Sequence, residues 1–292
     1  MRAEIEQAVS LLQRHDEASL EQALALLQNT VFSFSMRICG QREDAEDTMQ
    51  EVLVKSLPYL PKFDSPKALV VWLYKVAKNR CLMNRRKSKF APKESLSLDQ
   101  LIPDRRELES LTENASINPE ALAIRSEEAQ LLRAAIQNLP PTYRTVLVLR
   151  DMEELTDVEV AEITGLKPGT VRVRLHRARL FVRKELAKLH QPTKPRIITL
   201  HGAATPPPSP ARCKAMFAEL SNYLDQQLDD KLCGELEKHM EGCEPCQAFL
   251  SNLEGAIQQI RRSTVESPDQ IAAAELREQL LASYKLLRAA RN

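Results

Sequence analysis

The stretch LTDVEVAEITGLKPGTVRVRLHRARLFVRKEL, residues 155–186, constrains the fold more than any other part of this chain. Thr156 is followed three residues later by Glu159, which is the spacing of a capping box at a helix N-terminus. The short helix that begins there meets Gly165, which can adopt the left-handed conformation that a tight turn needs. Pro168 suits the first turn of a second helix, because its missing N–H would have no intrahelical acceptor there. The stretch therefore predicts a helix-turn-helix.

The second helix of such a motif enters the major groove of DNA, with its N-terminal residues against base edges. Helical spacing turns Val171, Leu175 and Ala178 toward the core and leaves the basic side chains outside. Arginine suits DNA contact because its guanidinium makes paired hydrogen bonds with guanine and with phosphate. The candidate DNA-contacting residues are Thr170, Arg172, Val173, Arg174, His176 and Arg177. The alternative is a helical hairpin with a solvated basic face.

Charge is segregated along the chain, although the net charge is only +1. Residues 75–89 contain seven basic side chains and no acidic one, and residues 167–188 contain eight basic side chains against the single acid Glu185. Two separate basic blocks favour two contacts with a polyanion, although each block alone is also compatible with a solvated helix face.

The rest of the chain is also predicted to be helical, because glycines number only 7 and β-branched runs are short. Apolar residues recur at helical spacing in 4–12, 20–38, 42–57 and 66–89, and again from Pro119 onward. A long amphipathic helix is predicted at 269–290. Residues 91–118 are polar with weak periodicity, and residues 191–211 are rich in proline, so both are predicted linkers.

HMEGCEPC, residues 239–246, places His239, Cys243 and Cys246 at a spacing common for zinc. Tetrahedral zinc needs a fourth ligand, and the sequence offers Cys213 or Cys233. The alternatives to a metal site are an incidental reduced CxxC and a redox dithiol.

No apolar run of 18 residues is present, and the N-terminal residues carry charges throughout, which predicts no membrane association and a cytoplasmic location. Thiols stay reduced in that compartment. Cys39 and Cys81 lie in apolar helical contexts, so we expect them to be core thiols.

Two motifs in order resemble a known family. LPPTYRTVLVLRDMEELTDVEVAEITGLKPGTVRVRLHRAR, residues 139–179, resembles region 4 of the extracytoplasmic-function group of bacterial sigma-70 factors, which reads the promoter −35 element. GQREDAEDTMQEVLVKSL, residues 40–57, followed by WLYKVAKNRCLMNRRK, residues 72–87, resembles region 2 of the same family. The resemblance covers roughly residues 20–189, and it departs from the family at Thr156-Asp157, where the family often has an aromatic second residue.

The resemblance implies two further sets of site residues. The residues expected to bind core RNA polymerase are Asp44, Glu46, Asp47, Gln50 and Glu51. Those expected to bind the −10 element are Lys75, Lys78, Asn79, Arg80, Asn84, Arg85 and Arg86. Capture of single-stranded DNA requires amides, aromatic rings and cations together. This second set supplies the amides and the charge, and Trp72 is expected to be a core residue more than a stacking platform.

The His-x3-Cys-x2-Cys motif resembles the small zinc-binding domain of many anti-sigma factors, in which the upstream ligand opens the first helix. That resemblance selects Cys213, and implies one zinc ion held by Cys213, His239, Cys243 and Cys246. Because such domains block polymerase binding, we expect autoregulation of the sigma domains by the C-terminal domain, or its binding to a separate regulatory partner.

The sequence thus predicts an all-α chain of two helical sigma domains and a small helical zinc-binding domain. The predicted segments are region 2 at 1–90, a linker at 91–118, region 4 at 119–190, a proline-rich linker at 191–211 and the zinc-binding domain at 212–292. The expected function is to direct RNA polymerase to promoter DNA; the alternative is a polymerase-independent helix-turn-helix regulator with a zinc- or redox-sensing domain. Four protein ligands leave zinc no open position for water, so we expect no enzymatic activity.

Overall fold

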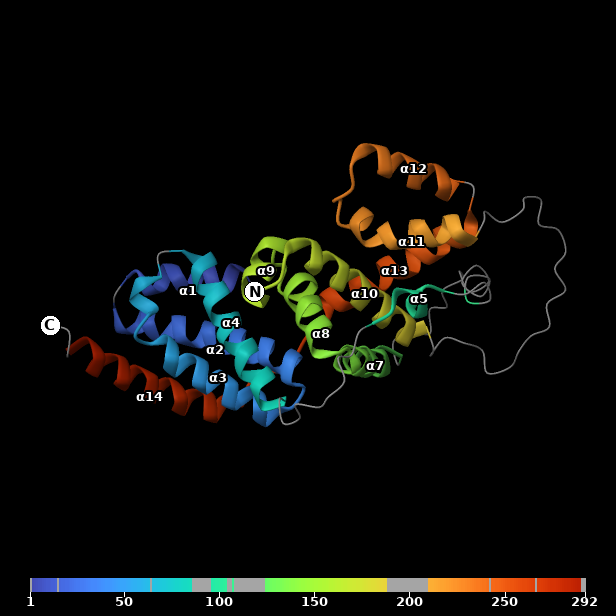
Figure 1. Cartoon of the computed structure of the whole chain (residues 1–292). Coiled ribbons are helices and arrows are strands. Elements are labelled where there is room, and N and C mark those ends of the chain that lie inside the picture. Colours follow the sequence, from blue (N-terminus) through green and yellow to red (C-terminus); the bar gives the residue numbers. More distant parts are fainter. Residues whose placement is uncertain are drawn as a thin grey trace. The chain divides into compact units, whose positions relative to one another are not determined.

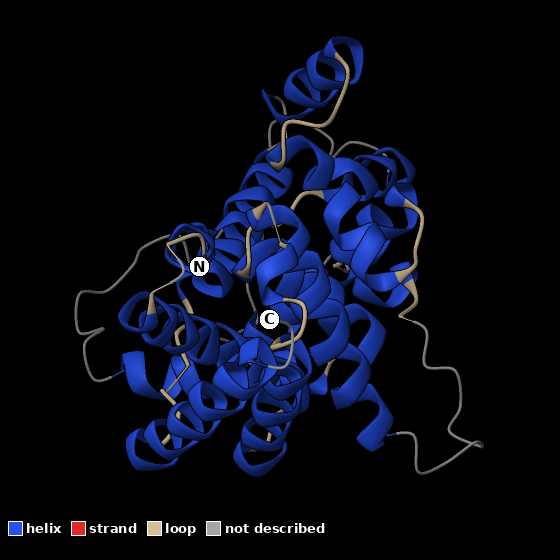
Figure 2. Ribbon diagram, turned by 90° about the vertical axis from the view of Figure 1, so that its left-hand side faces the viewer, coloured by secondary structure: helices blue, strands red, loops and turns tan. Residues whose placement is uncertain are grey.

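The structure, a computed structural model, describes residues 2–14, 16–63, 65–85, 96–103, 107, 124–187, 210–241, 243–265 and 267–289. All regular secondary structure in these ranges is helical (Figure 2), which confirms the predicted all-α class. The chain divides into two compact units, which are described separately. The first comprises residues 1–93, 144–171 and 264–292, and the second comprises residues 94–143 and 172–263.

The first unit is built around α2, a long helix whose apolar residues are buried by its neighbours (Figure 1). Its N-terminal elements are α1 (Arg2–Leu12), α2 (Glu17–Cys39), α3 (Arg42–Ser56), η1 (Leu60–Lys62) and α4 (Pro66–Arg85). Asp16 caps α2 by accepting from the Ser19 N–H at 2.8 Å, and Gly40 ends it with φ of 79°. Glycine adopts this left-handed conformation without steric strain, and the conformation turns the chain from α2 into α3.

The middle segment of the first unit contains the start of the helix-turn-helix. It comprises most of α8 (Pro141–Leu147), the π-helical turn η2 (Val148–Met152), α9 (Asp157–Thr164) and the first residues of α10 (Pro168–Ala187). The predicted capping box is confirmed: Thr156 Oγ1 accepts from the Glu159 N–H at 3.3 Å, and Glu159 Oε2 accepts from the Thr156 N–H at 2.8 Å. Gly165 has φ of 73°, as the predicted turn requires.

The last helix of the chain, α14 (Gln270–Ala289), also belongs to the first unit and matches the predicted helix at 269–290. It packs along α2 and α3 (Figure 1). Its apolar stripe of Ala273, Leu276 and Leu280 is buried, at the helical spacing of three and four residues.

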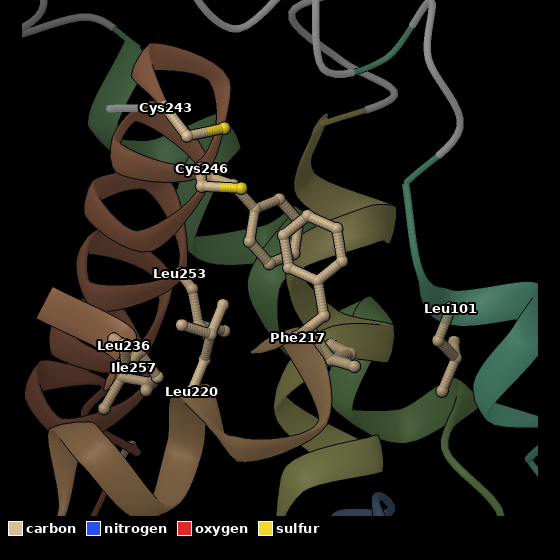
Figure 3. Packing of buried hydrophobic residues seen from close by; sticks show 10 residues of the cluster. Leu101, Phe217, Leu220, Leu236, Cys243, Cys246, Leu253 and Ile257 are labelled. Atoms are coloured by element: carbon tan, nitrogen blue, oxygen red, sulfur yellow. The ribbon is translucent and has the colours of Figure 1, made fainter. Parts of the chain in front are cut away.

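The second unit has its own apolar core. Its elements are α5 (Leu98–Leu101), α7 (Ile124–Asn138), most of α10, α11 (Pro210–Leu224), α12 (Asp230–Glu241) and α13 (Glu244–Arg262). Phe217 of α11 packs against Phe249 of α13 with the rings tilted and their centroids 4.7 Å apart, and Leu180 of α10 belongs to the same core. Figure 3 shows Phe217 in this core together with Leu220 and Leu253. Burying side chains of this size stabilises by about 1.5–3 kcal/mol each.

Much of the two predicted linkers lies outside the described residues. Within the first of them, α5 forms a single helical turn whose Leu101 is buried in the core of the second unit. This part of the predicted linker is therefore packed against the helices around it.

Candidate functional site

Helix α3 carries the acidic residues that the sequence assigns to polymerase binding. Asp47 and Gln50 are exposed, while Asp44, Glu46 and Glu51 are half-buried. Residues three and four apart share a helix face, so α3 brings all five onto adjoining stripes. Glu51 accepts from Lys55 Nζ at 2.6 Å and pairs with Arg80 of α4 at 2.6 Å. The Lys55 hydrogen bond, with Arg80 adding to it, lowers the pKa of the Glu51 carboxyl.

The α14 helix lies beside this acidic face. A groove between the two helices is lined on the α3 side by Glu46, Asp47, Met49 and Gln50, and on the other by Pro268, Asp269, Ala272, Ala273, Glu275, Leu276 and Gln279. Three of the five residues assigned to polymerase binding, Glu46, Asp47 and Gln50, thus border α14. The sequence predicted the helix but gave no indication of this contact.

A buried amide of α2 fixes the position of α14. Gln28 is fully buried, its Nε2 donates to the Ala273 carbonyl at 2.9 Å, and its Oε1 accepts from Arg277 Nη1 at 2.9 Å. Buried amides need both a donor and an acceptor, and here α14 supplies both. The ion pair of Lys285 with Glu17 at 2.6 Å is exposed and contributes little.

The candidate −10 residues lie on or after α4. Lys75 and Asn79 are exposed, while Lys78 and Arg80 are half-buried. Lys78 Nζ donates to the Ile163 carbonyl at the end of α9 at 2.8 Å, and burial lowers its pKa. The side chains of Asn84 and Arg85, and the whole of Arg86, lie outside the described residues.

The candidate −35 residues divide into two groups along α10. Thr170, Arg172 and Val173 are exposed, as base contacts require. Arg174 and Arg177 are half-buried, the first over the Tyr143 ring at 5.8 Å and the second donating to the Leu96 carbonyl at 3.1 Å. The predicted core positions Val171, Leu175 and Ala178 are buried.

His176, the remaining candidate, is covered by α11. Only 6% of it is exposed, and its Nδ1 lies 2.8 Å from Ser221 Oγ of α11. Burial, with Arg179 and Arg177 nearby, lowers the pKa of His176 to about 4, so the ring is neutral at physiological pH. A histidine in this environment cannot contact DNA while α11 remains in place.

Two further arginines of α10, which sequence reasoning did not select, are buried against the C-terminal segment. Arg179 makes a two-pronged ion pair with Asp225, Nη1 to Oδ2 at 2.8 Å and Nη2 to Oδ1 at 3.0 Å. Arg183 pairs with Glu107 and lies over the Phe249 ring of α13, 4.4 Å from its centroid. Arg179 and Arg183 are four residues apart and so share a helix face, but this spacing is equally typical of a solvated basic face.

The predicted metal ligands converge in the second unit. His239 lies in the last turn of α12, Cys243 directly precedes α13 and Cys246 lies in the first turn of α13, so the end of one helix and the start of the next bring the three together. All three are buried, their ligand atoms lie within 4.8 Å of one another, and His239 Nε2 is 3.3 Å from Cys246 Sγ. Figure 3 shows the two sulfurs pointing to the same side of α13. Bond lengths of about 2.0–2.3 Å to zinc in a tetrahedron give similar separations between ligand atoms, so the cluster fits this ion.

The two candidates for the fourth ligand, Cys213 and Cys233, lie on α11 and α12 respectively. Cys213 lies in the first turn of α11, and its side chain is outside the described residues. Cys233 lies on α12, is half-buried and stands outside the three-residue cluster.

Cys39 and Cys81 are buried as predicted, but the structure joins them as a disulfide between α2 and α4, with Cα atoms 5.4 Å apart. The expectation of free thiols is therefore wrong for this pair. Their apolar contexts predicted burial, whereas their proximity depends on how α4 packs on α2.

No helix among the described residues is both long and apolar enough to cross a membrane.

Comparison with known proteins agrees with this arrangement. Residues 24–90 match the family model "Sigma-70 region 2", residues 129–182 match "Sigma-70, region 4" and residues 213–247 match "Putative zinc-finger". The chain is 27% identical over 194 residues to ECF RNA polymerase sigma factor SigW of Bacillus subtilis, an alignment covering 63% of this chain and 98% of that protein. It is 34% identical over 159 residues to ECF RNA polymerase sigma factor SigE of Mycolicibacterium smegmatis, covering 54% of this chain and 58% of that protein. It is 29% identical over 189 residues to the RNA polymerase sigma-H factor of Pseudomonas aeruginosa, covering 63% of this chain and 94% of that protein.

The first of these relatives is matched over almost its whole length, yet much of the present chain remains outside the alignment. The acidic helix α3 and the basic helix α4 lie within the match to region 2, and the helix-turn-helix lies within the match to region 4. The cluster of His239, Cys243 and Cys246 follows both regions in the sequence. The chain therefore contains sigma-70 regions 2 and 4, resembles bacterial extracytoplasmic-function sigma factors over both regions, and continues past region 4 into a segment that matches the family model "Putative zinc-finger".

Proposed function

We propose that this protein directs RNA polymerase to specific promoters, and that its own C-terminal segment, residues 210–289, holds it in an inactive state. The observation that carries the second half of the proposal is that this segment contacts two sigma surfaces. Its last helix packs on α2 and α3, and α11 and α13 pack on α10. The protein acts by binding, in the cytoplasm, and not by catalysis.

In this proposal α3 binds the core enzyme. Asp47 and Gln50 present polar groups to solvent, and Asp44 lies on the same stripe as Asp47 and Glu51. Acidic side chains near a helix N-terminus are also compatible with the helix dipole, so the charge needed for a basic partner surface does not destabilise α3.

Promoter DNA is contacted by two helices. Lys75 and Asn79 of α4 supply a cation and an amide for the single-stranded −10 element. Arg172 of α10, with Thr170 and Val173, is exposed at the end of the helix that enters the major groove at the −35 element.

The α14 contact interferes with polymerase binding. The groove residues Glu46, Asp47 and Gln50 face α14, so a partner helix from polymerase and α14 compete for overlapping parts of α3. Gln28 makes the contact specific, because its two hydrogen bonds are satisfied in one register of α14.

The zinc-finger domain interferes with −35 recognition. Ser221 of α11 engages His176 of α10, and Asp225, which directly follows α11, engages Arg179, so both α10 side chains are withdrawn from DNA. The two buried α10 arginines in this contact favour a reversible interface, because water and phosphate can satisfy them when the domain leaves.

We further propose that one zinc ion, held by Cys213, His239, Cys243 and Cys246, fixes α11, α12 and α13 to one another. When bound, zinc cross-links the three helices and so compensates for the small apolar core of a domain of this size. Because thiolates are oxidisable, metal loss on oxidation would loosen the domain and release α10.

The test is in vitro transcription with core polymerase and a promoter selected from random DNA by the polymerase–protein complex. A full chain with a protease site inserted between residues 195 and 205 is compared before and after cleavage, together with Cys243→Ser. We expect promoter-dependent transcription from the full chain to be weak and to rise after cleavage followed by a high-salt wash, and in Cys243→Ser.

Equal transcription from all forms would contradict the autoregulation. Specific DNA binding with no association with core polymerase would contradict the sigma-factor function and favour a polymerase-independent regulator. These two failures are distinguished because the first is seen in transcript yield and the second in co-purification with core enzyme.

A further inference from the structure

Within the first unit, residues 144–171 of region 4 pack directly on α2 and α4 of region 2. The two parts are far apart in sequence and belong to different family matches, at 24–90 and 129–182. The contact is made of buried polar groups, and three side chains carry it.

Glu153, just after η2, is the central group of the contact. Its side chain is fully buried, Oε1 accepts from Arg37 Nη1 of α2 at 2.7 Å, and Oε2 accepts from the Tyr74 hydroxyl of α4 at 2.5 Å. Burial raises the pKa of Glu153, while Arg37 and the Tyr74 hydrogen bond oppose the rise and favour the carboxylate. Burial, with the adjacent carboxylate, raises the pKa of Tyr74 as well, so the phenol stays protonated and donates.

The two other side chains cap helix ends across the contact. Arg144 is buried, and its Nη1 donates at 2.8 Å to the carbonyl of Ile38, one residue before the end of α2. In the opposite direction Lys78 of α4 donates at 2.8 Å to the carbonyl of Ile163, one residue before the end of α9. The last carbonyls of a helix lack intrahelical partners and carry the negative end of its dipole, so a cation satisfies both needs.

These groups have a common property: region 2 and region 4 each satisfy buried polar atoms of the other. An apolar contact would tolerate sliding, whereas a buried carboxylate clamped by a guanidinium and a phenol has one favourable geometry. When the contact opens, water can replace every partner, so the cluster permits separation and specifies a single closed form.

We propose that residues 144–171 and the α2–α4 face of region 2 form a closing interface within the chain, held shut by Glu153 between Arg37 and Tyr74. The partner of this region 2 surface is thus region 4 of the same molecule. Closure engages the Lys78 ammonium with α9 and removes it from the set available to −10 DNA. This consequence for promoter binding rests on the proposed function, while the interface itself does not.

Hydrogen–deuterium exchange on the full-length protein tests the interface without polymerase or DNA. Glu153→Gln keeps the size of the side chain but removes the carboxylate charge that pairs with Arg37. We expect amides in η2, α9 and the facing parts of α2 and α4 to exchange about ten- to a hundredfold faster, which is the equilibrium effect of losing a hydrogen bond to a charged group. The matched control is Glu154→Gln, which makes the same change at the exposed neighbouring position and should exchange as the wild type does.

A triple variant keeps the proposal testable if Glu153→Gln fails to fold. Arg37→Met, Tyr74→Phe and Glu153→Leu together remove every polar atom of the clamp, and apolar replacement of a buried ion pair is often neutral or stabilising. We expect this variant to retain wild-type protection at the interface.

Unchanged exchange in a folded Glu153→Gln variant would overturn the proposal. So would a uniform rise that included α1 and α3, since it would mean that the clamp supports the core of region 2 and not a separable contact. Failure of the sigma-factor function would leave these exchange results as they are and would be seen only as loss of polymerase association.

Discussion

The Arg179–Asp225 ion pair offers the sharpest test of how the zinc-finger domain is held on α10. Arg179 is fully buried and the Asp225 side chain is 6% exposed, and the two make a two-pronged contact at 2.8 and 3.0 Å. Arg261 approaches the same carboxylate at 3.6 Å but is half-exposed, so its share is screened by solvent. The perturbation is Asp225→Ala in the full chain.

The size of the effect on docking depends on which of the two states, docked or undocked, the substitution destabilises. In the docked state the substitution removes the two-pronged carboxylate partner of a buried guanidinium, and breaking a buried ion pair in this way costs about 3–5 kcal/mol. In the undocked state Arg179 is hydrated, so the substitution costs almost nothing there. The docking equilibrium therefore shifts toward release by about two to four orders of magnitude, since about 1.4 kcal/mol corresponds to tenfold.

The assay is binding of the polymerase–protein complex to its selected promoter, measured by fluorescence anisotropy at fixed salt concentration, because affinity for DNA depends steeply on salt. We expect Asp225→Ala to bind more tightly than the wild type until docking no longer limits affinity. Glu235→Ala is the control, because it removes one negative charge from an exposed position of α12 in the same domain. If both variants raised affinity equally, general charge repulsion would explain the effect, and the reasoning from the buried pair would be refuted. Circular dichroism of both variants checks that the domain remains folded.

Three further outcomes are expected. Because burial lowers the pKa of His176 to about 4 against about 6.5 when exposed, its contribution to the stability of the second unit is complete above pH 6.5. It is lost as pH falls from 6.5 toward 4, by up to about 3 kcal/mol, and urea denaturation of wild type and His176→Phe should show a smaller pH dependence in the variant. Gln28→Leu removes both hydrogen bonds to α14, so the packing of α14 on α2 should become weaker by about 1–3 kcal/mol. Amide exchange should become faster in α14 alone, and unchanged exchange would contradict the role of Gln28. Cys246→Ser should lower bound zinc from about one equivalent per chain, measured by mass spectrometry, and increase proteolysis in α11 to α13; full zinc content would exclude Cys246 as a ligand.

The helix-turn-helix could be predicted in detail because its signals are local. Thr156 and Glu159 lie one helical turn apart, and the conformations of Gly165 and Pro168 depend on the residue type itself. The metal cluster was predictable for the same reason, since His239, Cys243 and Cys246 are brought together by a single turn. In such cases the chain within about eight residues determines the geometry.

Long-range contacts could not be predicted in this way. Arg179 and Arg183 have the same sequence signature as solvated arginines, and their burial depends on Asp225 and Glu107, which lie 46 residues after and 76 residues before them respectively. In the sequence, Gln28 resembles any polar residue on an apolar helix. Its role depends on the acceptor and the donor that α14 supplies, Ala273 and Arg277, which lie 245 and 249 residues later.

The two masking contacts are joined by a short segment, which makes their effects interdependent. The zinc-finger domain ends its last helix at Arg262 and α14 begins at Gln270, so release of one contact leaves the other tethered nearby. A short flexible linker holds a ligand at an effective concentration of roughly millimolar, so a contact weakened alone re-forms often. Asp225→Ala alone should free α10 while α14 still borders α3, and Gln28→Leu alone should have the converse effect. The double variant should therefore raise promoter-dependent transcription by more than the product of the two single effects, because only it exposes both surfaces at once. Strictly multiplicative effects in this double-mutant cycle would show that the contacts open independently, and the segment between Arg262 and Gln270 would then transmit nothing between them.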